Sequence, residues 1–153
     1  MMPKNFPPWV WEAALDKMNR VSRRKKKRSA DPCYGIVDAK SVKTQFACDE
    51  IGYDGGKKVK RHKRHIAVDI LGDLLHILVH VANLNDTKKA YDVLEGTYDK
   101  YTKIRHFSED WGYRRIAVKF VEKRLDITLH ILMRIKDGFA VLPKRWIVKR
   151  TFA

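Results

Sequence analysis

The alternation of apolar and polar residues predicts a chain with several strands. The predicted strands cover residues 34–43, 66–70, 74–82, 104–110 and 127–135. The first, YGIVDAKSVK, is apolar and β-branched and carries one acid, Asp38. Gly72-Asp73, between the second and third strands, is a hairpin signal.

Apolar residues spaced along one helix face predict helices between these strands. The predicted helices cover residues 11–19, 86–101 and 111–125, and another begins after Pro143. Asp86 is expected to cap the helix that it begins. A mixed sheet with helices on its faces follows from this order of elements.

Two strongly basic segments interrupt the pattern. Arg20–Pro32 has Lys or Arg at seven of its first nine positions and little to bury, which predicts a solvated linker. Such a linker either contacts phosphates regardless of their sequence or serves as a flexible tether. Lys57–Arg64 (KKVKRHKR) is a second basic cluster, and it leads directly into the strand at 66–70.

The net charge is +15 over 153 residues, which indicates what kind of partner this α/β domain binds. A field of this sign attracts polyanions, and nucleic acid is the expected partner. No membrane role is expected, because no apolar run approaches the roughly 20 residues of a spanning helix. Cys33 and Cys48 have no metal-type spacing and fit a reducing compartment, so we expect a cytoplasmic protein.

Asp38 and Asp110 are the acids that suggest chemistry. A carboxylate inside an apolar strand is costly unless it has a partner. One interpretation is structural: Asp38 caps a turn or pairs with Lys40 or Lys43. The other is that Asp38 and Asp110, each at or near the end of a strand, meet at the sheet edge where α/β proteins bind ligands.

Two carboxylates from neighbouring strands can both ionise when a cation lies between them. Hard oxygen ligands select Mg²⁺ or Mn²⁺, and in a basic protein the natural substrate of such a site is a phosphodiester. Other polar candidates receive structural interpretations. His76 and His80 are about 13 Å apart on a strand and are expected to be surface or satisfied residues, and Asp69 is expected to be a hairpin-end carboxylate beside basic neighbours.

Several motifs in order resemble one known family. The segments VDAKSVKT, GYDGGKKVKRHKRHIAVDILGDLLHILVHVAN, EDWGY and GFAVLPKRWIVKRTFA are similar to transposases of bacterial insertion sequences, most closely the insertion-sequence-five group. The resemblance runs from about residue 31 to the last residue. It implies a ribonuclease H-like fold and a DDE catalytic set that binds Mg²⁺ or Mn²⁺.

The resemblance also implies roles for individual residues. The first two catalytic aspartates fall on Asp38 and Asp110. The lysine-rich run expected near DNA phosphates supplies Lys57, Lys58, Lys60, Arg61, Lys63 and Arg64. The glutamate of the family falls on Lys149, and neither Glu109, on the other strand face, nor Glu122, further along the next helix, is a convincing substitute.

The resemblance further implies a copy that is incomplete at both ends. Residues 1–30 would be an abridged N-terminal region, and 31–153 a catalytic core shortened in its last helix. The expected activity of the family is cleavage and strand transfer of double-stranded DNA at terminal repeats, by a possible homodimer near the bacterial nucleoid. Lys149 suggests that this activity is impaired. The alternatives are a non-catalytic DNA binder or competitor of full-length transposase and, from charge alone, an RNA-associated protein.

Overall fold

The computed structural model describes residues 7–43, 52–54, 59–81, 86–110, 122–132 and 144–152 of the chain. The helices are α1 (Pro8–Lys25), α2 (Asp86–Lys100) and α4 (Arg145–Thr151), and residues 122–125 are also helical. The strands are β1 (Tyr34–Lys43), β2 (Gly52–Asp54), β3 (Val59–Val68), β4 (Leu74–Val81), β5 (His106–Asp110) and β6 (Thr128–Leu132).

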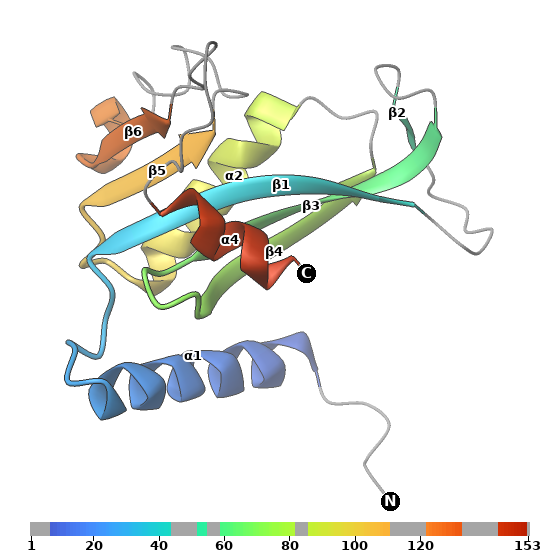
Figure 1. Ribbon diagram of the computed structural model, residues 1–153. Helices are drawn as coiled ribbons and strands as arrows, with labels where there is room; N and C mark the ends of the chain where they lie inside the picture. Colours follow the sequence, from blue (N-terminus) through green and yellow to red (C-terminus); the bar gives the residue numbers. More distant parts are fainter. Residues whose placement is uncertain are drawn as a thin grey trace, which may run out of the picture.

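The strands form one mixed sheet (Figure 1). Its order is β2-β3-β1-β5-β6, and β4 also pairs with β3. Strand β1 lies antiparallel to β3 and parallel to β5, which is itself parallel to β6. The expectation of a mixed sheet with helices on its faces is therefore confirmed.

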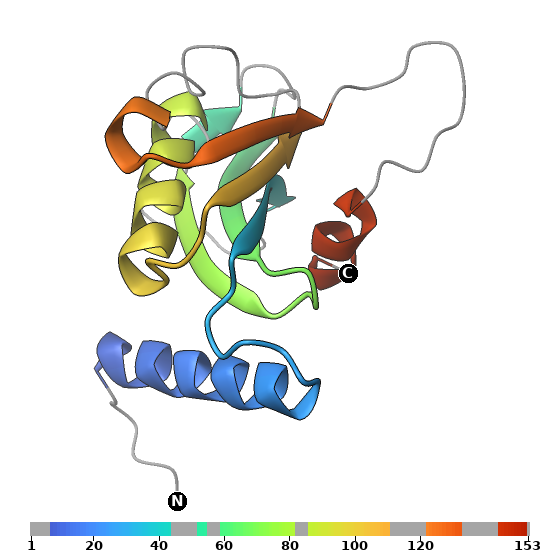
Figure 2. The same ribbon diagram turned by 90° about the vertical axis from the view of Figure 1, so that its left-hand side faces the viewer.

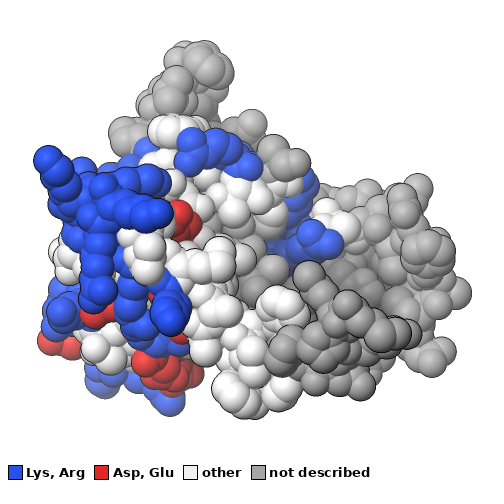
Figure 3. All heavy atoms as spheres, turned by 90° about the horizontal axis from the view of Figure 1, so that it is seen from below, with Lys and Arg blue, Asp and Glu red and all other residues white. Residues whose placement is uncertain are grey.

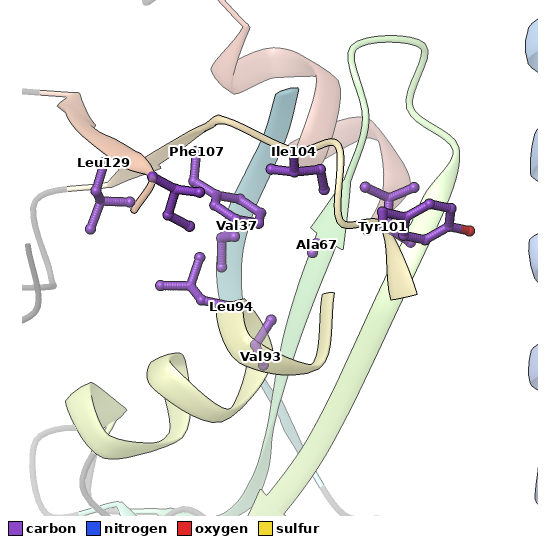
Figure 4. Packing of buried hydrophobic residues seen from close by; sticks show 10 residues of the cluster. Val37, Ala67, Val93, Leu94, Tyr101, Ile104, Phe107 and Leu129 are labelled. Carbon is purple, nitrogen blue, oxygen red and sulfur yellow. The ribbon is translucent and has the colours of Figure 1, made fainter. Parts of the chain in front are cut away.

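Helices α2 and α4 lie on opposite faces of this sheet (Figure 2). Val37 of β1 packs with residues of α2 and β5 in the larger core cluster, part of which Figure 4 shows. Ile36, its neighbour, packs with Ile147 and Val148 of α4. Because successive residues of a strand point to opposite faces, β1 is buried on both sides, which explains its nearly continuous apolar run.

Strand β3 begins at Val59, not at Ile66 as the apolar pattern predicted. The basic cluster therefore lies largely inside the strand. Long basic side chains can remain solvated while their backbone pairs in a sheet; Arg64 is exposed and Lys63 is half-buried. The apolar pattern misses this part of the strand because its residues are polar, and His62, Lys63 and Arg64 keep contact with water, although the polar His65 is buried.

Helix α1 is longer than the predicted helix at 11–19 and includes the first six residues of the expected linker. Its apolar Trp11 and Met18 are 61% and 65% exposed, whereas its Asn19 and Arg23 are buried. Arg23 forms a buried ion pair with Asp69 at the β3–β4 turn. The expectation of a solvated linker is wrong at Arg23, because the Asp69 carboxylate neutralises it.

The side chain of Asp69 holds the β3–β4 turn through hydrogen bonds to the backbone of the turn. Its Oδ1 accepts the backbone N–H groups of Leu71 and Asp73 at 2.8 and 3.0 Å. Asp69 is thus the hairpin-end carboxylate with a basic neighbour that the sequence suggested.

The β4 histidines face α2, and neither is fully exposed. His76 is half-buried, and its Nε2 lies 2.7 Å from the place that a Cβ on Gly96 would take. His80 is buried, with Nδ1 2.8 Å from the Val81 carbonyl oxygen. Of the two alternatives that the sequence left open, a surface residue or a satisfied one, the first does not hold for His80, because the strand turns its imidazole toward the covered face of the sheet.

Candidate active site

Asp38 lies on the α4 face of β1, two residues after Ile36, and is 8% exposed. Its Oδ1 accepts the N–H of Ala39 at 2.9 Å, and its Oδ2 lies 3.5 Å from the Nζ of Lys149. Lys40, one of the two partners suggested by the sequence, donates instead to the carbonyl of Phe152. The side chain of Lys43, the other, lies outside the described residues.

Helix α4 holds Lys149 at this position. Ile147 and Val148 pack against the apolar residues of β1 and β3, and the Arg150 guanidinium donates to the Leu71 carbonyl at 3.2 Å. The Lys149 side chain is 54% exposed. The fold thus brings Lys149 to Asp38, although the two are far apart in the sequence. The ammonium group of Lys149 lies on the solvent side of the mostly buried Asp38 carboxylate.

Asp110 is the last residue of β5. Val37 pairs with Glu109 in the parallel register of β1 and β5. The next residues of the two strands, Asp38 and Asp110, therefore lie at the same level on neighbouring strands. Such strands lie about 4.8 Å apart. The backbones of the two aspartates are therefore adjacent, while the side chain of Asp110 lies outside the described residues.

Glu109 belongs to the opposite face of the sheet. It is buried and shares its register position with Val37, which packs toward α2. In α2, burial raises the pKa of Tyr91 above its ordinary value, and the charge of Glu109 adds to this shift. Glu109 is therefore not available beside Asp38, and Glu122 is an exposed helical residue.

The described residues around Asp38 do not suit a divalent cation. Mg²⁺ and Mn²⁺ need several oxygen ligands, whereas Asp38 faces an ammonium group. Within the described parts of the chain, no group of three or more His, Cys, Asp and Glu side chains is placed to hold a metal. No chemical step through a metal follows from this arrangement.

The basic residues expected to contact DNA do not form one described surface. Lys57 and Lys58 lie outside the described residues, and only the backbones of Lys60 and Arg61 are described, in β3. Lys63 and Arg64 alternate along β3, which places them on opposite faces of the sheet. Arg64 pairs with Lys40 and shares the face of Asp38.

The clearest basic surface lies at the C-terminal end of α1. Arg24, Lys25, Lys26, Lys27 and Arg28 are all exposed there, and Figure 3 shows Lys and Arg gathered at this end. The charge run in the sequence indicated this surface, but the pattern did not show that the last residues of a helix and the turn after it form it. None of the helices described is long and apolar enough to cross a membrane.

Comparisons with known proteins agree with this architecture. The transposase DDE domain family matches residues 29–153 of the chain. The fold is similar to the catalytic domain of Mos1 mariner transposase, with a TM-score of 0.50 and 13% identity over 99% of this chain and 74% of that one. This likeness supports the ribonuclease H-like arrangement of the mixed sheet.

Larger transposase structures are also similar to this chain. A piggyBac transposase in a synaptic complex with hairpin DNA gives a TM-score of 0.46 and 10% identity over 74% of this chain. The Mos1 strand transfer complex gives a TM-score of 0.44 and 14% identity over 88% of this chain. This chain spans 25% and 44% of the lengths of those two chains, respectively. No curated protein matches it.

The family match covers the sheet, Asp38 and Lys149, and includes most of the chain. The expected likeness to DDE transposases is thus confirmed at the level of the family. The chain belongs to the transposase DDE domain family.

Proposed function

We propose that this chain is an insertion-sequence transposase of the insertion-sequence-five group that binds DNA and does not cut it. Family membership supports an origin in DNA transposition. The observation that carries the loss of cutting is the contact between Lys149 and Asp38, 3.5 Å apart. In this proposal Asp38 and Asp110 are the positions that hold Mg²⁺ or Mn²⁺ in an active relative.

Electrostatics support the loss of metal binding. Two like unit charges about 4 Å apart near a protein surface repel by roughly 4 kcal/mol, and a divalent ion doubles this. Solvent screening reduces the repulsion, since Lys149 is 54% exposed. The ammonium nevertheless both repels the metal and neutralises the carboxylate that would attract it.

The proposed partner is double-stranded DNA that carries the terminal repeats of the element, bound in the bacterial cytoplasm at the nucleoid. The net charge of +15 and the exposed basic end of α1 support this partner. Such contacts go to phosphates and need no metal. Binding by a homodimer is compatible with this proposal, which does not depend on it.

A plasmid nicking assay tests the proposal. Supercoiled DNA bearing the terminal repeats is incubated with Mg²⁺ or Mn²⁺ and either the unaltered chain or the Asp38→Asn variant. We expect no nicking by either protein and equal binding of both to a repeat duplex. Metal-dependent nicking that Asp38→Asn abolishes would overturn the proposed loss of cutting, and an absence of duplex binding would overturn the proposed partner.

A further inference from the structure

Three ring-bearing residues lie together on the sheet face that also holds Asp38. Tyr34 begins β1, His106 begins β5, and His130 lies in β6. The Tyr34 ring centroid is 6.3 Å from that of His106 and 6.5 Å from that of His130, and the two imidazoles are 5.6 Å apart. The rings of Tyr34 and His130 are nearly parallel, with an interplanar angle of 11°, and the His106 ring is inclined to them by 31° and 29°, respectively.

This ring cluster, Tyr34, His106 and His130, is open to solvent. His106 and His130 are exposed and Tyr34 is half-buried. The cluster lies outside the main core, which is on the other face of the sheet against α2, although Tyr34 packs against the smaller core cluster beside α4. Exposed rings contribute less to folding than buried ones, since the hydrophobic gain scales with the area removed from water.

Polar groups adjoin the ring cluster. The Nζ of Lys144, an exposed residue just before α4, lies 3.8 Å from the Tyr34 ring centroid. Ser108 lies between Ile36 and His130 in the register, and its buried Oγ has no hydrogen-bond partner among the described residues. The surface itself therefore offers ring faces together with a cation.

We propose that the ring cluster is a stacking platform for an unpaired nucleobase of single-stranded DNA, with Lys144 placed for the neighbouring phosphate. Aromatic side chains on a sheet surface are a common means of binding unpaired bases, because every base has a flat π-face. Tyr34 precedes Asp38 by four residues of β1, or about 13 Å. A strand end held here would therefore run along the same face toward Asp38. The proposal rests on DNA binding as the proposed function.

The test compares single-stranded and duplex DNA by fluorescence anisotropy. The His106→Leu/His130→Leu variant removes two rings, and His106→Phe/His130→Phe keeps rings but removes their nitrogens. We expect the leucine variant to bind a short single strand about tenfold more weakly and a blunt duplex as well as the unaltered chain does. The phenylalanine variant should retain single-strand binding. Trp9→Leu, which removes an exposed ring on α1, is the matched control. It should change neither the affinity for the single strand nor the affinity for the duplex.

A second measurement reports stacking directly. A 2-aminopurine at the 3′ end of the single strand should lose fluorescence on binding to the unaltered chain and the phenylalanine variant, but not to the leucine variant. Equal reductions of single-strand and duplex affinity, or equal reductions in the leucine and phenylalanine variants, would overturn the platform while duplex binding stands. If the unaltered chain binds no duplex, the proposed function fails as well.

Discussion

At the scale of single residues, we propose that Lys149 keeps a divalent cation from the carboxylate of Asp38. With Lys149 replaced by glutamate, the site would present acids in place of an ion pair. We expect Lys149→Glu to gain stability from Mn²⁺, because a ligand that binds only the folded state at 100 times its Kd stabilises by about 2.7 kcal/mol. This corresponds to roughly 5–10 °C in Tm for a chain of this size. Thermal unfolding with and without Mn²⁺ measures it.

Two further variants separate metal binding from charge removal. Lys149→Gln lacks the ammonium but adds no ligand, and its Tm should respond to Mn²⁺ far less than that of Lys149→Glu. Asp38→Asn/Lys149→Glu should lose the response. A Tm of the unaltered chain that rises with Mn²⁺ as much as that of Lys149→Glu would show that the ammonium is no obstacle.

His76 should make the stability of the protein depend on pH. Burial under α2 lowers its pKa below the ordinary 6.5, and the charge of Lys100 lowers it further, while Glu12 and Asp16 act in the opposite direction. The unfolded chain therefore takes up the proton more readily than the folded one. The contribution of His76 to stability is complete above pH 6.5 and is lost as the pH falls through the lowered pKa.

Urea unfolding at pH 7.5 and at pH 5 measures this effect. The unaltered chain should lose more stability between the two values than His76→Gln, which cannot take up a proton. The same loss in both proteins would assign the pH dependence to other groups.

At the scale of elements, α1 is attached to the domain by polar contacts. Its Arg23 pairs with the fully buried Asp69, and Tyr101 donates its hydroxyl to Asp16 at 2.7 Å. Removing one partner of a buried ion pair typically costs about 3–5 kcal/mol. We expect Arg23→Met to lower the free energy of unfolding by this amount. Arg24→Met, which removes an exposed neighbour, should change it by about 0.5 kcal/mol or less.

Tyr101 provides a local measure of how tightly α1 is held. Burial raises the pKa of its phenol to about 12, and the hydrogen bond to Asp16 adds to this. If Arg23→Met loosens α1, the phenol should titrate closer to its ordinary value of 10, as followed by phenolate absorbance. An Arg23→Met protein as stable as Arg24→Met, with an unchanged titration, would contradict this role of the ion pair.

The elements that the sequence predicted well are those whose burial leaves a clear mark on the apolar residues. β1 begins and ends as predicted because burial on both faces gives it a nearly continuous apolar run, and α2 begins at Asp86 because one buried stripe runs along it. The start of β3 and the end of α1 were missed, since both lie in basic segments where local hydrophobicity carries no period. Asp38 was identified from the cost of a buried charge, but its contact with Lys149 joins β1 to α4 and depends on the tertiary fold.

The ring cluster shows a second limit of the sequence. Tyr34, His106 and His130 lie far apart along the chain, and none of them stands out in its own segment. Only the parallel order of β1, β5 and β6 brings them together. Residues joined by neighbouring strands have no spacing that a sequence pattern can reveal.

At the scale of the whole molecule, the charge of +15 is unevenly distributed. On the face that Figure 3 shows, Lys and Arg gather at the end of α1, whereas Lys63 and Arg64 of β3 point to different sides of the sheet. One straight duplex cannot contact both faces of a sheet through these two neighbours. The end of α1 is therefore the surface that we expect to contribute most of the contacts to phosphates.

The salt dependence of duplex binding tests this expectation. Removing one cation that contacts a phosphate should make the slope of log K against log salt concentration shallower by about 0.9. Lys26→Gln/Lys27→Gln, at the exposed end of α1, should reduce the slope by about 1.8. Lys89→Gln/Lys123→Gln removes the same charge elsewhere and should leave the slope unchanged. Equal changes in both double variants would mean that net charge, and not the surface that α1 presents, determines how this protein binds DNA.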